Sequence, residues 1–341
     1  MSLSAAIRDR DVAELPGKRD EDWRWTDLRG LIRILPQPSG PFEGDPGAGP
    51  FDELVQRVVI VANGRGEALI DVPTGETASV ALRLVSRGDG AHAAEVRITL
   101  GAGARLQLLE SYEGEGAYLA ETSLTLTLGE GASVSRLVLA NDSADGVSAS
   151  QADVTLAARA DFVQTVVASG ARRQRIETRV AHPGGHATLR LDGLYLLADK
   201  RHSDQTTVVT HLGVDGTTEQ LAKGVVRDQA RGVFQGRIVV AEGADRTDAK
   251  MGHHALILSD RAEVDAKPEL EIYADDVACA HGNTVGALDE DTLFYARQRG
   301  LPEAEARALL TEAFIGEVVD RIGHEGAREV IRAWVAERLR V

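Results

Sequence analysis

The fold is decided by a short stretch, GAGARL at residues 101–106, that returns in altered form along the chain. Successive copies begin 28, 28 and 27 residues apart, and the last begins 57 residues further on, about two more periods. A regular spacing of roughly 20 to 50 residues is typical of solenoids and arrays. The copies read GEGASV at 129–134, AARADF at 157–162, GGHATL at 184–189 and AEGADR at 241–246.

Apolar residues alternate with other residues in short runs from about residue 54 to residue 278. A period of two places the alternating side chains on one face of a strand. No long segment with a period of 3.6 interrupts the runs, which disfavours a parallel sheet wound with helices. We therefore expect a mainly β fold with a β-helix (β-solenoid) core, while an antiparallel sandwich stays open. The clearest alternating residues are Val96, Ile98, Leu100, Leu124, Leu126, Leu128, Leu189, Leu191, Leu270 and Ile272.

Residues 1–53 are predicted to form an N-terminal helical region and a linker. A short helical candidate ends at Pro16, and a second one carries an apolar stripe. Five prolines and four glycines at 36–50 predict a loop that lies over the next domain. The stripe consists of Trp23, Trp25, Leu28 and Leu31.

Residues 54–287 are the predicted β-helix core, and residues 288–341 are a predicted C-terminal helical domain. The apolar period changes to 3.6 after about residue 288, which indicates amphipathic helices. We expect one helix over 289–299 that Gly300 closes, a second that begins near Pro302, and a third over 326–340. Such helices would cap the solenoid and offer a docking surface.

Composition excludes several classes of function. The 341 residues carry a formal net charge of −15, which argues against a general nucleic-acid binder. The single cysteine cannot form an intrachain disulfide or a four-cysteine metal site within one chain. The sequence shows no signal peptide and no membrane span, so we expect a cytoplasmic protein. No phosphate-binding GxxxxGK[ST] motif is present, so the chain should not hydrolyse ATP itself.

The sharpest local feature is the run of Cys279, Ala280 and His281. Positions i and i+2 of an extended segment face the same way, so the thiol and the imidazole would be co-facial. Such a pair can bind a soft metal, or the histidine can activate the thiol as a nucleophile. Two ligands are too few for a stable metal site, which favours a site completed by a second chain. A buried cysteine beside a turn histidine is the structural alternative.

Other titratable residues are weaker candidates. His253 and His254 are adjacent and would point to opposite faces of a strand, so one metal cannot easily bind both. Acidic strand residues could form the carboxylate pair of a β-helix carbohydrate-active enzyme, although such residues are usually solvated on the outer face. A purely structural solenoid is a third reading. The scattered histidines are His182, His186, His202 and His211, and the acidic residues are Asp192, Asp248, Glu263 and Asp265.

A long ordered series of segments resembles the SufB/SufD family of iron–sulfur cluster assembly proteins. The close match runs from position 224 to position 301, and the opening of the chain resembles that of SufD-type members. Members of the SufB type carry more cysteines, so this chain is similar to the SufD type. The segments are DEDWRWTDL at 20–28, ARGVFQGRI at 230–238, RTDAKM at 246–251, VDAKPELEIYADD at 264–276, CAHG at 279–282 and TVG at 284–286.

This resemblance implies a right-handed parallel β-helix with helical regions at both ends. It implies a scaffold subunit without its own catalytic activity, in a complex with a SufB-like subunit and two copies of a SufC-like ATPase that binds ATP. The C-terminal helices would contact SufC, and the isolated chain would form a homodimer. His281 maps to a histidine implicated in assembling a transient iron–sulfur cluster at the interface with SufB. Cys279 maps to its neighbouring cysteine, flanked here by alanines where relatives often carry Lys and Ser.

Overall fold

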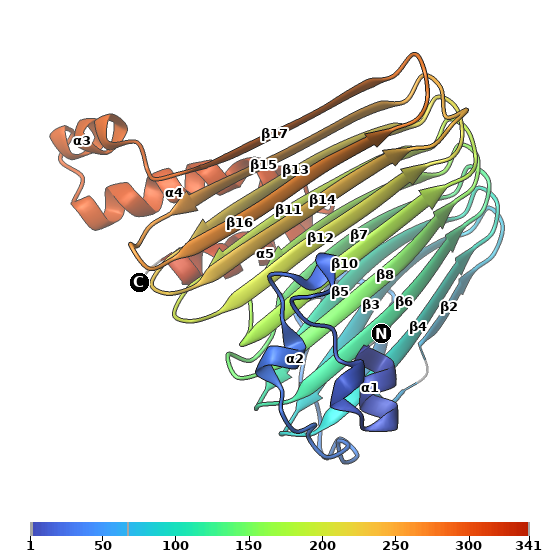
Figure 1. Cartoon of the computed structure of the whole chain (residues 1–341), viewed down its shortest axis with the longest axis horizontal. Coiled ribbons are helices and arrows are strands. Elements are labelled where there is room, and N and C mark those ends of the chain that lie inside the picture. The colour runs from blue at the N-terminus through green and yellow to red at the C-terminus, as the bar shows by residue number, and fades with distance from the viewer. Residues whose placement is uncertain (1–2, 67, 340–341) are drawn as a thin grey trace.

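The computed structural model describes residues 3–66 and 68–339 and forms a parallel β-solenoid (Figure 1). Strands alternate between two sheets, and neighbouring strands within each sheet run parallel, which rules out the antiparallel sandwich. The odd-numbered strands form one sheet: β1 (Arg57–Ala62), β3 (Thr77–Arg87), β5 (Arg105–Glu115), β7 (Ser133–Asn141), β9 (Asp161–Ala168), β11 (Thr188–Leu197), β13 (Thr217–Val226), β15 (Asp248–Ile257) and β17 (Ala278–Gly286).

The even-numbered strands form the second sheet, and each pair of successive strands makes one coil of the solenoid. Both sheets pack face to face around one core, which is mostly apolar but also holds buried polar side chains, among them the ion pair of Arg136 and Glu110. The strands are β2 (Leu69–Val72), β4 (Ala91–Leu100), β6 (Leu119–Leu128), β8 (Val147–Leu156), β10 (Arg173–His182), β12 (His202–His211), β14 (Arg231–Val240) and β16 (Glu263–Ile272).

The strand register explains the sequence repeat. Arg105 pairs with Ser133, Ser133 with Asp161, and Asp161 with Thr188, so these coils have the lengths that the repeat predicted. The next two coils are longer, because Thr188 pairs with Thr217 and Thr217 with Asp248. The copy of the repeat at 241–246 lies further ahead of its strand, β15, than the other copies lie ahead of theirs, so its predicted spacing was out of register.

The core is a set of aliphatic ladders, as the alternation predicted. Ile98 pairs with Leu126 and Leu126 pairs with Val154, and all three side chains are buried. Each fully buried aliphatic side chain contributes about 1.5–3 kcal/mol of transfer free energy. The last coil differs: Leu270 is half-buried and Ile272 is exposed, because within residues 3–66 and 68–339 no strand follows β16 in its sheet.

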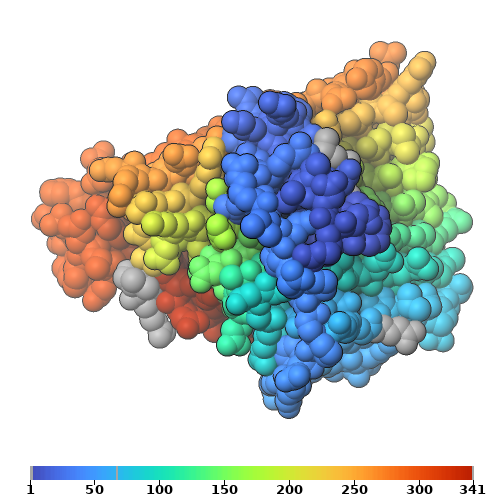
Figure 2. Space-filling model, turned by 60° about the horizontal axis from the view of Figure 1, so that its bottom comes forward, coloured from blue at the N-terminus to red at the C-terminus, as the bar shows by residue number. Residues whose placement is uncertain are grey.

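The N-terminal region lies across the face of the solenoid, where Figure 2 shows it in blue. Leu28 is buried against strands β4, β6 and β8, and Trp23 and Leu31 are half-buried on the same cluster. The linker also lies on the solenoid, as predicted, because Pro38 forms a bridge with Ala91. The helical elements are α1 (Leu3–Asp9), η1 (Val12–Glu14), η2 (Glu21–Trp23), α2 (Leu28–Leu31) and η3 (Asp52–Leu54).

Three C-terminal helices confirm the change of period: α3 (Glu290–Gln298), α4 (Glu303–Asp320) and α5 (Glu325–Leu339). Asp289 caps α3 by accepting from the backbone N–H of Thr292, and Gly300 follows it with φ +92°. The predicted end at Arg340 lies outside the described residues. Buried residues of α4 and α5 pack on outward residues of the odd-numbered sheet, including Leu109, Val167 and Leu194.

The three-domain division of the chain stays a prediction. Among residues 3–66 and 68–339, no helix is both long and apolar enough to cross a membrane.

Candidate site at the open end of the solenoid

The last coil of the solenoid has an uncovered edge. In the described part of the chain, β16 and β17 are the end strands of their sheets, so no strand pairs with their outer edges (Figure 1), and most of β17 is exposed. Unpaired N–H and C=O groups along such an edge form a template for another strand. Three large apolar side chains on this coil are exposed, with exposed fractions of 42% for Ile272, 64% for Tyr273 and 42% for Val285.

Cys279 and His281 lie on β17 at this edge. Cys279 pairs with Ala249 and His281 with Met251, and both partners belong to the buried inner row of β15. The two candidate residues therefore continue an inward row at the open mouth of the solenoid, with Cys279 half-buried against the core and His281 exposed. Their shared face follows from the strand period.

The thiol of Cys279 is not activated within this chain alone. Burial raises its pKa, and the nearby carboxylate of Asp248 raises it further, while the backbone at Ala249 opposes the change. The thiol form therefore prevails at neutral pH, and a thiolate requires a cation or metal from outside the chain. Among residues 3–66 and 68–339, no cluster of three or more His, Cys, Asp or Glu side chains could hold a metal ion.

A buried hydrogen-bond chain reaches the same edge, and the sequence interpretation missed it. Tyr195 Oη lies 2.9 Å from His253 Nε2, and His253 Nδ1 lies 2.7 Å from Asn283 Oδ1. Burial lowers the pKa of His253 to about 4, so the ring is neutral at neutral pH. With Nδ1–H donating to Asn283, Nε2 accepts from Tyr195, which leaves the amide N–H groups of Asn283 for the open end.

Four of the six other histidine candidates are buried, and two of them differ from the prediction. His253 is fully buried and His254 lies on the opposite face, as adjacent strand residues should. His182 and His211 are not scattered, because their ring centroids are 3.9 Å apart inside the solenoid. His202 is buried with Nε2 3.1 Å from the carbonyl oxygen of Trp25, and His186 is exposed.

The four acidic candidates do not converge on one site, and the two that lie on one strand, Glu263 and Asp265, share the same basic partner, Arg231. Each has a basic partner, and they come from β11, β15 and β16. Asp192 corrects the expectation of a solvated residue, because its side chain is fully buried beside Arg321 of the α4 end. Burial raises the pKa of Asp192 to about 6. Asp248 lies beside Lys250, and Glu263 and Asp265 lie beside Arg231.

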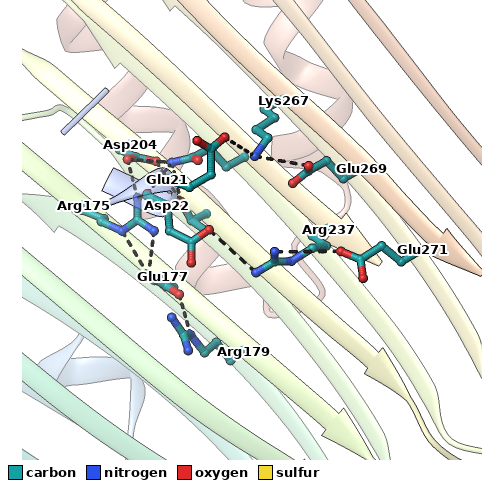
Figure 3. A network of polar contacts seen from close by, with 12 residues as sticks. Glu21, Asp22, Arg175, Glu177, Arg179, Asp204, Arg237, Lys267, Glu269 and Glu271 are labelled. Carbon is teal, nitrogen blue, oxygen red and sulfur yellow. Dashed lines mark hydrogen bonds and ion pairs between the residues drawn. The ribbon is translucent and has the colours of Figure 1, made fainter. Parts of the chain in front are cut away.

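A polar network fixes the N-terminal segment on the even-numbered sheet (Figure 3). Arg175, fully buried, donates to Asp204 at 2.7 Å and to Glu177 at 2.8 Å. Its Nη1 also donates to the backbone carbonyl of Asp22 at 2.6 Å. The hydroxyl of Thr26 donates to Asp204 at 2.5 Å. Residues 20–28, the segment that resembles the opening of SufD-type members, are therefore attached to the sheet by hydrogen bonds to the buried Arg175 and Asp204.

This network continues to the open end. Glu21 accepts from Lys267 of β16 at 2.9 Å, and the carboxylate of Asp22 lies 3.8 Å from Arg237 of β14 (Figure 3). The N-terminal segment therefore contacts the last strand of the even-numbered sheet. No sequence signal revealed these contacts, because the partners come from opposite ends of the chain.

Comparisons with known proteins agree with this architecture. The family model for the SufBD core domain of the SUF iron–sulfur cluster assembly system matches residues 83–314. The iron–sulfur cluster assembly protein SufD of Escherichia coli is 38% identical over 156 residues, which are 46% of this chain and 37% of that protein. A SufBD family protein of Synechocystis is 33% identical over 195 residues, 57% of this chain and 43% of that protein.

The matched segments thus span about two-fifths of those two relatives. A SufBD family protein of Mycobacterium bovis is 26% identical over 98% of this chain and 91% of its own length. The family match covers the coils from β3 onward and reaches α4, so it includes the open end and its cysteine and histidine. The chain belongs to the SufBD family of iron–sulfur cluster assembly proteins of the SUF system.

Proposed function

We propose that this chain is a SufD-like scaffold subunit that contributes half of a cluster assembly site. His281 and its neighbour Cys279 would provide ligands from the open end, and a SufB-like partner would provide the others. The observation that carries this proposal is the position of the two side chains. They continue an inward row of the solenoid at its uncovered end. The iron–sulfur cluster is the cargo of this site, and the chain itself performs no catalysis.

The edge of the last coil supports a β-rich partner. Along the outer edges of β16 and β17, the backbone groups have no neighbouring strand in the described part of the chain. A partner solenoid whose own edge meets them would continue the ladders and cover Ile272, Tyr273 and Val285. The polarity of the mouth suits sulfur and iron species, because imidazole and thiolate both bind iron.

The C-terminal helices support a second partner. Phe294 and Tyr295 on α3 and Leu309 on α4 expose 62%, 59% and 53% of their surface. Such large apolar residues on helices are typical of a protein-binding surface. We assign this surface to a SufC-like ATPase, which would bind and hydrolyse ATP while this chain transmits the resulting movement.

Cluster reconstitution on the purified complex tests the assignment. We expect His281→Ala to leave the fold and the complex intact and to lower the yield of iron–sulfur cluster. His186→Ala is the matched control, because His186 is also exposed and lies at a turn away from the mouth. An unchanged yield in His281→Ala would refute the role of His281. Loss of the complex itself would instead assign His281 to partner binding.

A further inference from the structure

A cavity of about 540 Å³ lies between the C-terminal helices and the turns of the solenoid. Its walls come from α4, from the end of α5, from the ends of β11 and β13, and from the turns that follow β9, β11, β13 and β15. Leucine, valine and alanine side chains form much of the surface. Cavities of this size hold small molecules in many proteins, and they combine apolar walls with a few charged groups.

Positive charge is concentrated around this cavity. Four arginines line it, Arg201, Arg227, Arg307 and Arg338, against one aspartate and one glutamate. The surplus is unusual in a chain whose formal net charge is −15. Arginine is the side chain that best recognises phosphate and carboxylate groups, because its donors form a planar fork.

Two of these arginines, Arg201 and Arg338, donate hydrogen bonds to neutral acceptors. Arg201 donates to the backbone carbonyls of Gly170 at 2.7 Å and Asp142 at 3.0 Å. Arg338 donates to Asn141 Oδ1 at 2.7 Å, and its nearest carboxylate belongs to Glu337, 3.7 Å away and 81% exposed. Burial lowers the pKa of Arg338, the carboxylate of Glu337 opposes this change, and the neighbouring charge of Arg201 adds to it. A bound anion would relieve this repulsion.

We propose that this cavity binds a small phosphate ester, with the phosphate held by Arg201 and Arg338 and an apolar body against the aliphatic wall. Arg227 and Arg307 line the same cavity and add two further positive charges. A ligand there contacts both helices and the solenoid, so it fixes the helices on the outer face of the odd-numbered sheet. The site is separate from the open end and does not depend on the proposed function.

Calorimetric titration of the full chain with phenyl phosphate tests this proposal at constant ionic strength. We expect saturable binding to one site and a rise in melting temperature, because a ligand that binds only the folded state stabilises it. Inorganic phosphate should bind more weakly, because it lacks the apolar body. Equal affinities for phenyl phosphate and inorganic phosphate would contradict the proposed contact between the ligand and the aliphatic wall.

Substitutions then locate the binding. Arg201→Gln and Arg338→Gln should each weaken the binding of phenyl phosphate by about tenfold, the loss of one charge-assisted contact. Arg97→Gln is the control, because Arg97 is exposed on β4 away from the cavity, and it should bind as the wild type does. Should either cavity variant unfold, Arg307→Gln serves instead, because Arg307 is 43% exposed. No saturable binding, or equal binding in all cavity variants, would overturn the proposal.

Discussion

Asn283 lies on the exposed last strand of the solenoid, yet its Oδ1 is 2.7 Å from Nδ1 of the fully buried His253. The edge strand is therefore tied to the core by one polar contact in addition to its ladder. Since His253 also accepts from Tyr195, the chain of hydrogen bonds has a fixed direction. We expect the order of the open mouth to depend on this contact.

Asn283→Ala should destabilise the last coil. The substitution leaves the buried N–H of His253 without its protein acceptor, which costs about 1–3 kcal/mol. Urea unfolding and hydrogen exchange along β17 measure the effect. Thr284→Ala is the matched control, because Thr284 contacts His254 on the other, exposed face of the same strand at 2.7 Å. Equal losses in the two variants would contradict the importance of the buried contact.

Asp204→Ala should release the N-terminal segment. Removing this carboxylate takes a partner from the buried Arg175 and an acceptor from Thr26, and breaking a buried ion pair costs about 3–5 kcal/mol. We expect faster trypsin cleavage after Arg24 together with lower stability. Asp153→Ala is the control, because Asp153 is exposed on β8. Unchanged cleavage would show that the segment is held by other contacts.

The stability of the fold should fall as pH drops below 6.5. Burial lowers the pKa of His92, His182 and His253 to about 4, and burial together with His182 lowers that of His211 to about 3. Unfolded histidines take up protons from about pH 6.5 downward, whereas these folded ones do not until about pH 4. Their contribution is therefore present above pH 6.5 and is lost on acidification.

His182→Leu isolates one of these titrations. Each buried neutral histidine adds a slope of at most about 1.4 kcal/mol per pH unit between these pKa values. The variant should have a smaller slope of unfolding free energy between pH 6.5 and 4 than the wild type. If the unfolding free energy has the same pH slope in the wild type and in His182→Leu, the imidazoles of His182 and His211 do not stay neutral in the folded protein.

Phe294→Asp should weaken binding of the SufC-like ATPase. A charge at this exposed position removes apolar contact area without touching the cluster that holds α4 and α5 on the solenoid. A pull-down with the purified ATPase measures binding. Ile34→Asp, at a residue 86% exposed in the N-terminal region, is the control. Full retention by Phe294→Asp would place the contact elsewhere.

Much of the fold was predictable, because it depends on local patterns. The spacing of the repeat predicted the coils from Arg105 to Thr188, and Asp289 and Gly300 marked the two ends of α3 in the sequence. The longer coils after Thr188 were not predictable, since turn length leaves no periodic signal.

The site was predictable only in part. Cys279 and His281 are close neighbours on one strand, so strand geometry alone made them co-facial. The pairs His253–Asn283 and His182–His211 each join residues in register on neighbouring strands, and both contacts depend on the length of one coil. Asp192 and Arg321 meet only because a helix folds back onto the sheet. Such contacts follow from stacking and have no local sequence signature.

The most direct test of the shared site is pulsed electron paramagnetic resonance on the assembled complex. Only this chain would be labelled with 15N-histidine, and the cluster would be reduced to a paramagnetic state. We expect a 15N coupling typical of an iron-bound imidazole, which is absent when the labelled chain carries His281→Ala. A cluster of normal yield without any 15N coupling would contradict ligation by His281.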